Sequence, residues 1–181
     1  MEQNRLSIYQ IDMKYIRDLS NKDENVRSVS PQINKEKRPF VGIVVVNDNK
    51  QYCIPFSSPK PKHYQMKNDV DFTKMFDDQN KLIGVLNFNN MIPVDESVLI
   101  PFNLEKAKND TPEIIHYKKM VKKQLNWCQK NQNSIVSKAN KLYYLVTETP
   151  EKYIYLTRRC CDFKKLEAVL EKRFYCREKR V

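Results

Sequence analysis

The chain contains no long hydrophobic run and no leader-like beginning. Although 40% of its 181 residues are hydrophobic, no stretch approaches the roughly 20 apolar residues that cross a bilayer as a helix. The first ten residues, MEQNRLSIYQ, lack the apolar core of a signal peptide. At this length one domain is expected rather than two. We therefore expect residues 1–181 to form a single soluble, cytoplasmic domain without membrane contact.

Metal-binding and disulfide patterns are also missing. The chain has five cysteines and two histidines, with no CxxC pair and no zinc-like spacing. Cys53 and Cys128 lie in apolar patterns, where cysteine usually behaves as a small buried hydrophobe. Cys160 and Cys161 are adjacent and poorly placed for an ordinary disulfide with each other. We expect reduced, structural cysteines, and neither a metal site nor a cofactor.

Acidic side chains are scarce in the last third of the chain. Residues 1–117 hold 16 basic and 16 acidic side chains, whereas residues 118–181 hold 17 basic and only 6 acidic ones. The net charge of +11 therefore belongs to the last third. Such an excess favours a polyanionic partner, nucleic acid in particular. A solvated face of lysine-rich helices is the alternative.

The most informative stretch is RPFVGIVVVNDNKQYCIPFSSPK, residues 38–60. Two apolar runs, at 40–46 and 51–56, flank a turn cluster at 47–49, a pattern typical of a hairpin. Pro59 has no N–H and favours an extended backbone at the residue before it, so strand pairing should end there. The hairpin therefore predicts a polar loop at its end.

That loop carries two hydroxyls and an ammonium group. Ser57 and Ser58 precede Lys60, and a near-symmetrical hairpin would bring Arg38 to the same edge of the sheet. Two cations beside two hydroxyls predict a phosphate site, and loops fixed to a rigid sheet are favoured places for function. A plain polar turn after a core hairpin is the alternative interpretation.

Other patterns predict further strands and helices. Alternation of apolar and polar residues over 6–11 predicts a short strand. Asp12 can cap a helix over 13–19, and Tyr15 lies in the first turn of that helix. Tyr15 in isolation would be a core tyrosine with a satisfied hydroxyl. The expected elements that remain are a long loop at 20–37, strands at 82–88 and 91–94, and helices at 112–131, from Asn133 or Ser134 to 146, and at 163–177 after Asp162. A sheet of about five or six strands follows.

Two groups of residues are candidates for RNA binding. The helix at 112–131 places its apolar side chains on one arc, and the adjoining arc carries Lys118, Lys119, Lys122 and Lys123. Lys62 and His63 follow the polar loop. His63 could be a general acid or base, because histidine side chains in general titrate near neutrality, although a histidine with no visible partner is more often an exposed loop residue.

Five motifs occur in order along the chain: KYIRDLS at 14–20, RPFVGIVV at 38–45, PFSSPK at 55–60, LNFNNMIPV at 86–94, and HYKKMVKKQLNWCQKNQNSIVSKANKLYYLV at 116–146. Together they resemble the ToxN/AbiQ-like toxins of type III toxin–antitoxin systems. Membership of the CptN branch of this family is left open by these motifs. The resemblance implies an α+β domain with a strongly twisted, mostly antiparallel β-sheet packed by helices, distantly like the Kid and MazF toxins. It also implies a metal-independent endoribonuclease.

The resemblance carries the family's functional tyrosine to Tyr15, its strand-leading lysine to Arg38, and its Thr-Ser-Pro-Lys loop to Ser57, Ser58, Pro59 and Lys60. Arginine in place of lysine keeps the charge but does not readily transfer a proton. A second family tyrosine would fall near Asn34, and no tyrosine is there.

The partners implied by the resemblance are RNA molecules. An RNA antitoxin of repeated pseudoknots would bind and inhibit the protein in a toxin–RNA hetero-oligomer, without a protein antitoxin, and cellular or phage RNA would be the substrate. Lys60 is the candidate for proton transfer and Tyr15 its alternative. Composition alone would favour the competing interpretation, a non-catalytic RNA- or DNA-binding module that grips phosphates with the same side chains.

Overall fold

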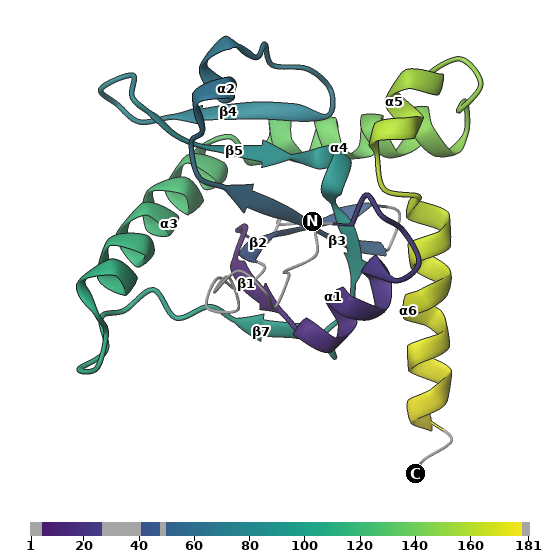
Figure 1. Cartoon of the computed structure of the whole chain (residues 1–181), viewed down its shortest axis with the longest axis horizontal. Helices are drawn as coiled ribbons and strands as arrows, with labels where there is room; N and C mark the ends of the chain where they lie inside the picture. Colours follow the sequence, from purple (N-terminus) through teal and green to yellow (C-terminus); the bar gives the residue numbers. More distant parts are fainter. Residues whose placement is uncertain (1–4, 27–40, 48–49, 179–181) are drawn as a thin grey trace.

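Seven antiparallel strands form an open sheet in the described part of the chain (Figure 1). The computed structural model describes residues 5–26, 41–47 and 50–178. The strands are β1 (Ile8–Ile11), β2 (Val41–Asn47), β3 (Lys50–Ser57), β4 (Phe72–Phe76), β5 (Leu82–Asn87), β6 (Ile92–Val94) and β7 (Leu99–Pro101). Their order is β4-β5-β3-β2-β1-β7, and β6 pairs with β3. The predicted α+β class is confirmed.

The predicted hairpin of β2 and β3 lies at the centre of this sheet. Its register pairs Gly42 with Pro55 and Asn47 with Lys50. On its other side, β3 pairs first with β6 and then, at Phe56 and Ser57, with β5. Ser57, at the end of β3, therefore lies beside β5, where β5 and β4 extend the sheet (Figure 1).

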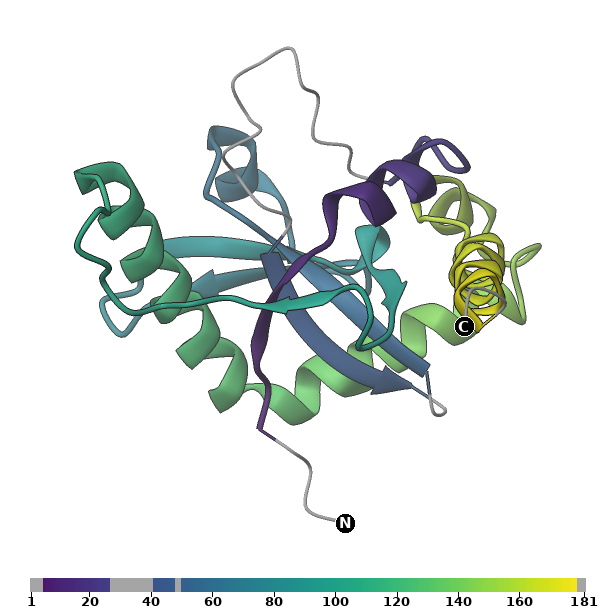
Figure 2. The same ribbon diagram turned by 90° about the horizontal axis from the view of Figure 1, so that it is seen from below.

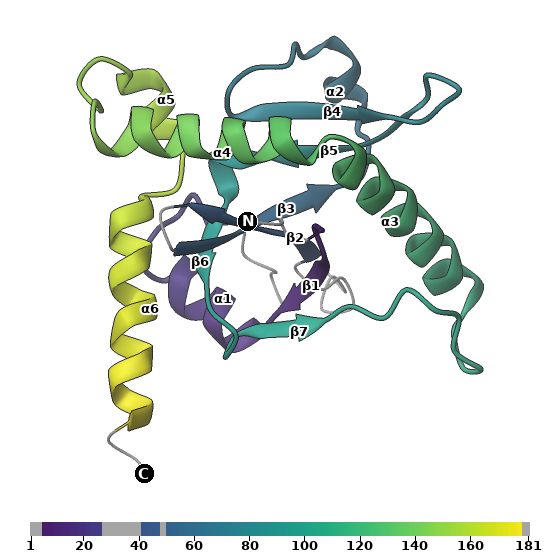
Figure 3. The same cartoon turned by 180° about the vertical axis from the view of Figure 1, so that it is seen from behind.

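Six α-helices surround the sheet among the described residues: α1 (Met13–Ser20), α2 (Pro61–Gln65), α3 (Pro112–Lys130), α4 (Gln132–Thr147), α5 (Ile154–Arg159) and α6 (Phe163–Glu178). Figure 2 shows α4 along one face of the sheet, with α1 and α2 on the opposite side. Figure 3 shows α3 and α6 flanking the sheet at either end of α4. Within the described ranges, no helix combines the length and apolar character needed to span a membrane.

Side-chain caps explain where several helices begin. Asp12 accepts the backbone N–H of Tyr15 at 2.8 Å, and Asp162 accepts that of Lys165 at 3.1 Å, as predicted from the sequence. The cap predicted at Asn133 or Ser134 is wrong, because α4 begins at Gln132, immediately after α3 ends. The sequence also missed β4, β7, α2 and α5, and its count of five or six strands was too low.

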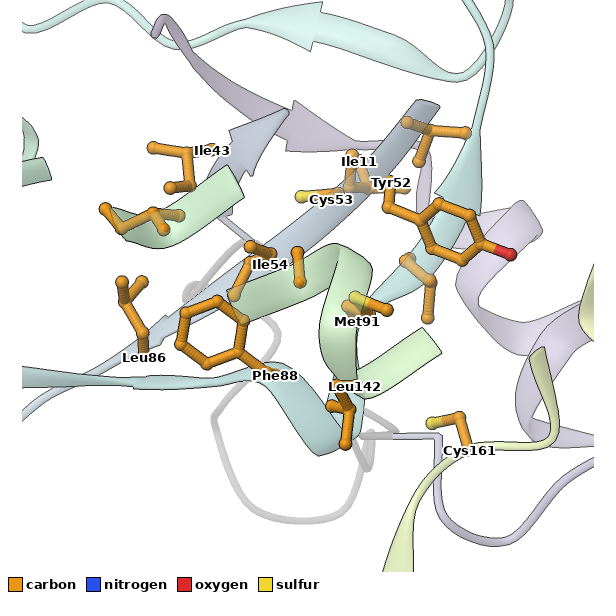
Figure 4. Packing of buried hydrophobic residues seen from close by; sticks show 14 of the residues in the cluster. Ile11, Ile43, Tyr52, Cys53, Ile54, Leu86, Phe88, Met91, Leu142 and Cys161 are labelled. Carbon is orange, nitrogen blue, oxygen red and sulfur yellow. The ribbon is translucent and has the colours of Figure 1, made fainter. Parts of the chain in front are cut away.

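The main core lies between the central strands and α4. Figure 4 shows Tyr52, Cys53 and Ile54 of β3 packed with residues from other elements, among them Phe88 and Leu142. The four cysteines other than Cys176 are buried and free, which confirms the burial predicted for Cys53 and Cys128, and burial raises the pKa of each thiol. The side chain of Cys176 lies outside the described residues.

Only two glycines occur in the chain, and both allow close packing of a strand. A Cβ at Gly42 would lie 2.2 Å from the carbonyl oxygen of Ile54 on the paired strand. A Cβ at Gly84 would lie 2.2 Å from Gln124 Nε2, which donates to the Ile83 carbonyl at 2.9 Å. Gly84 therefore lets α3 pack directly on β5, beside the strand end that carries Ser57.

A buried carboxylate ties α6 to the sheet and to α4. Glu167, which is 6% exposed, accepts hydrogen bonds from Lys50 Nζ, from the Tyr52 hydroxyl and, at 2.8 Å, from the Tyr143 hydroxyl. Burial by itself would raise the pKa of Glu167, but the hydrogen bonds from Lys50, Tyr52 and Tyr143 outweigh it and lower the pKa. The charged carboxylate is thus the form that the fold stabilises.

We expect Glu167→Gln to lower the free energy of unfolding at pH 7 by about 2 to 3 kcal/mol, because the buried Tyr52 hydroxyl, the Tyr143 hydroxyl and Lys50 all lose a charged acceptor. The folded-state pKa lies below the unfolded value, so this contribution is present at neutral pH and disappears as pH falls below about 4. Urea unfolding between pH 3 and 7 measures it. Glu171→Gln, an exposed change on the same helix, is the control. Equal pH slopes for the Glu167 variant and the wild-type protein would contradict this role.

Candidate active site

The predicted polar loop runs from the buried end of β3 to the surface. Ser57, the last residue of β3, is 5% exposed and pairs with Val85 of β5. Ser58 and Pro59 are half-buried, and Lys60 is exposed. Within four residues the chain therefore carries two hydroxyls and an ammonium group, and exposure rises from Ser57 to Lys60.

The Ser57 hydroxyl is held from the neighbouring strand. Asn87, at the end of β5, donates its side-chain N–H to Ser57 Oγ at 2.9 Å. The two residues are thirty positions apart, and the antiparallel register of β3 and β5 brings them together. Asn87 lies in the LNFNNMIPV motif, but no local sequence pattern marks it as part of the site.

Lys60 is the N-cap residue of the short helix α2. Pro61 begins the helix, a position that proline favours because the N–H it lacks would have no helical partner. The backbone N–H of His63 donates to the Lys60 carbonyl at 2.9 Å, and the N–H of Lys60 donates to His63 Nδ1 at 3.1 Å. The bond to His63 Nδ1 is the half of a capping box in which the third helical residue accepts the N-cap N–H, with histidine in the place of glutamate or glutamine; the bond to the Lys60 carbonyl is a backbone bond.

The expectation that His63 is an exposed loop residue is wrong. Its side chain is 4% exposed and its ring lies 5.7 Å from the ring of Phe72 on β4. A proline at the first helical position starts a helix here, and the third position turns the imidazole back toward the sheet. Of the two residues proposed for RNA binding after the loop, Lys62 is exposed and His63 is buried.

Tyr15 is a fully buried core residue. Its hydroxyl donates to the Pro93 carbonyl at 2.7 Å, and the Arg173 guanidinium lies 5.6 Å from its ring centre. Burial, and after it the nearby Asp95, raise the pKa of the hydroxyl above its usual range. Pro93 pairs with Tyr52, five residues before Ser57 on β3, roughly 16 Å at the rise of a strand. The structure therefore does not bring the Tyr15 hydroxyl to the loop.

Arg38, predicted as the second cation of the site, lies outside the described residues, as does Asn34. The same holds for most of the loop predicted over 20–37. No group of three or more histidine, cysteine or acidic side chains suited to hold a metal ion occurs in the part of the chain that the structure describes.

The basic helix α3 presents its lysines unequally. Lys119 and Lys122 are exposed, and Lys123 is exposed with its Nζ 3.9 Å from Asp77. Lys118 instead donates to the Asp110 carboxylate and to the Glu105 carbonyl, both at 2.8 Å, and its side chain is only 14% exposed. Lys118 therefore secures the loop before α3, which the sequence pattern did not reveal.

A groove of about 670 Å³ lies between α3 and the turn from β4 to β5. Phe76 and Trp127 contribute aromatic surface, and Lys123 and Lys130 contribute positive charge. None of the residues from Ser57 to Lys60 lines it. The groove is therefore distinct from the hydroxyl and lysine loop.

Sequence comparison assigns the chain to a family. A family model described as toxin ToxN of the type III toxin–antitoxin system matches residues 7–171. Endoribonuclease ToxN of Bacillus thuringiensis subsp. kurstaki is 31% identical over 163 residues, which cover 87% of this chain and 78% of that protein. Endoribonuclease AbiQ of Lactococcus lactis subsp. lactis is 31% identical over 76% of this chain and 74% of its own length. The chain therefore belongs to the ToxN family of type III toxins.

Solved structures share the whole fold. AbiQ, described as a lactococcal anti-phage endoribonuclease of a type III toxin–antitoxin system, matches with a TM-score of 0.79 at 27% identity, over 95% of this chain and 99% of that one. A chain from a type III system whose toxin is selectively inhibited by a non-coding RNA pseudoknot matches with a TM-score of 0.75 at 28% identity, over 93% and 98%. The resemblance inferred from the five motifs is confirmed.

Proposed function

We propose that this protein is a metal-independent endoribonuclease toxin that an RNA antitoxin restrains. Membership of the ToxN family supports endoribonuclease activity. The observation that carries the proposed site is the loop from Ser57 to Lys60, which places two hydroxyls and an exposed ammonium group at a rigid strand end. These groups bind and stabilise phosphate without a metal ion.

RNA supplies its own nucleophile, since the 2′-hydroxyl can attack the adjacent phosphorus. The reaction needs removal of the 2′-proton, stabilisation of a phosphorane-like dianion, and protonation of the 5′-oxygen that leaves. In our proposal, Lys60 stabilises the charge that develops on the non-bridging oxygens, while Ser57 and Ser58 donate hydrogen bonds to them. The products are a 2′,3′-cyclic phosphate and a 5′-hydroxyl.

Two further roles belong to this scheme. Arg38 is the proposed second cation at the phosphate, and Lys60 is the first candidate for proton transfer. Tyr15, the alternative, is buried and bonded to Pro93, so it would need a rearrangement to reach RNA. We therefore assign Tyr15 no step in the reaction.

The proposed inhibitor is a folded RNA of repeated pseudoknots. Structures of related toxins describe inhibition by a non-coding RNA pseudoknot and regulation of an antiviral system by a processed non-coding RNA. The net charge of +11 matches a polyanion. A cleaved end of the antitoxin bound at the Ser57–Lys60 loop as a product would block the site, and each RNA repeat would then bridge protein chains in a hetero-oligomer.

Incubation of the purified protein with RNA in EDTA tests the proposed activity against its competitor. We expect cleavage to continue in the chelator. An intact RNA that is nevertheless bound would favour the non-catalytic module, and activity that vanished in EDTA and returned with Mg²⁺ would contradict the metal-independent mechanism.

We expect Lys119 and Lys122 to bind phosphates away from the scissile bond. Changing both to Gln should weaken RNA binding broadly and lower the salt slope of log K by roughly 0.7 for each lost contact with single-stranded RNA. Filter binding at several salt concentrations measures the slope. Lys165→Gln with Lys172→Gln, on exposed positions of α6, is the charge-matched control. An unchanged slope for the α3 variant would restore the interpretation of a solvated face.

A further inference from the structure

Two polar side chains outside the Ser57–Lys60 loop, the half-buried Asn87 and the buried His63, form hydrogen bonds to its two ends. Asn87 of β5 donates to Ser57 Oγ at 2.9 Å, and His63 of α2 accepts the Lys60 N–H at 3.1 Å. We infer that Asn87 and His63 are positioning residues, which fix Ser57 and Lys60 for reaction without touching RNA themselves. This inference rests on the proposed function.

The two contacts belong to one continuous support under the loop. Asn87 pairs with Phe72 across β5 and β4, and the Phe72 ring packs on the His63 ring at 5.7 Å. The path from Ser57 through Asn87, Phe72 and His63 therefore returns to Lys60. Figure 1 shows α2 lying above β4 at the edge of the sheet.

Each contact constrains a group that takes part in the proposed reaction. A side-chain amide N–H that bonds to Ser57 Oγ occupies an acceptor site on that oxygen and fixes the side chain in one rotamer. The reciprocal bonds between Lys60 and His63 fix the backbone of Lys60 at the start of α2, and with it the direction in which its side chain leaves. Preorganised groups of this kind need no rearrangement as charge develops.

The chemistry of position 63 explains why histidine serves there. The position requires an acceptor for the Lys60 N–H and an apolar face for Phe72. A neutral imidazole with Nδ1 unprotonated supplies both. Glutamine, the usual residue of a capping box at this position, retains the acceptor, whereas leucine retains only the apolar bulk.

Single-turnover cleavage of an RNA oligonucleotide by the full-length protein tests the role of His63. We expect His63→Leu to lower kcat by about 10- to 100-fold, because a small displacement of a catalytic group is costly. KM should change little, since the bulk of the RNA-binding surface is untouched. His63→Gln should recover most of the rate. Gln65→Ala, an exposed change on the same helix, is the control, and thermal unfolding shows that each variant folds.

Double variants test whether the effects pass through Lys60 and Ser57. If His63 acts only by positioning Lys60, His63→Leu should lower kcat less than about twofold in a Lys60→Ala background, since coupled residues are not additive. Asn87→Leu should likewise lower kcat less than about twofold in a Ser57→Ala background. Full losses in both backgrounds, or His63→Leu at the wild-type rate, would overturn the inference and leave the proposed function standing. A wild-type protein that does not cleave RNA would overturn both.

Discussion

Lys60→Ala is expected to slow RNA cleavage by about 10³-fold, the upper range for removal of one group that stabilises a developing oxyanion. Lys60 is exposed at the start of α2. The backbone bonds to His63 do not involve the Lys60 side chain, and the substitution should therefore leave the loop intact.

Lys60→Arg separates the two roles proposed for this residue. If charge dominates, arginine should keep cleavage within about tenfold of wild type, since guanidinium also binds phosphate. Because arginine does not readily give or take a proton, equal losses for the two variants would point to proton transfer. Lys22→Ala, an exposed lysine on a different loop, serves as the control for loss of positive charge.

Ser58→Ala is expected to slow cleavage by about 10²- to 10³-fold through loss of one hydrogen-bond donor to the transition state. Ser58 is half-buried, next in the chain to the buried Ser57 and two residues before the exposed Lys60. Binding of RNA should weaken much less than the rate falls, because the donor acts mainly on charge that develops in the reaction.

Rate constants at saturating enzyme measure this effect, with Ser97→Ala in the turn between β6 and β7 as the control. A wild-type cleavage rate for Ser58→Ala would show that the active site is not at this loop. A large fall in the unfolding temperature of Ser58→Ala would show that Ser58 is needed for folding rather than for the reaction.

The sequence predicted elements whose patterns are local. The hairpin of β2 and β3, the Asp12 and Asp162 caps, and the long helix α3 follow from periodicity, turn residues and capping side chains within a few positions. It missed β4 because that strand lies within a polar stretch and is defined by its pairing with β5. The short strand β7 is likewise defined by its partner β1.

The same distinction applies to the site. The loop at Ser57, Ser58 and Lys60 was predicted, because proline and a strand end mark it in the sequence. The contact of Asn87 with Ser57 depends on a strand register thirty residues away, and no local pattern predicts it. The capping box of His63 was predictable in principle, since proline at the first helical position and an acceptor at the third are a known signature.

The central claim is that the RNA 2′-hydroxyl is the nucleophile and that no metal ion takes part. The most direct measurement is end-group analysis of an RNA oligonucleotide cut in EDTA, beside the same oligonucleotide with a single 2′-deoxy sugar at the cut site. We predict a 2′,3′-cyclic phosphate and a 5′-hydroxyl from the first and no cleavage at that position in the second. A 5′-phosphate with a 3′-hydroxyl, or cleavage of the deoxy-substituted strand at the same position, would contradict the account.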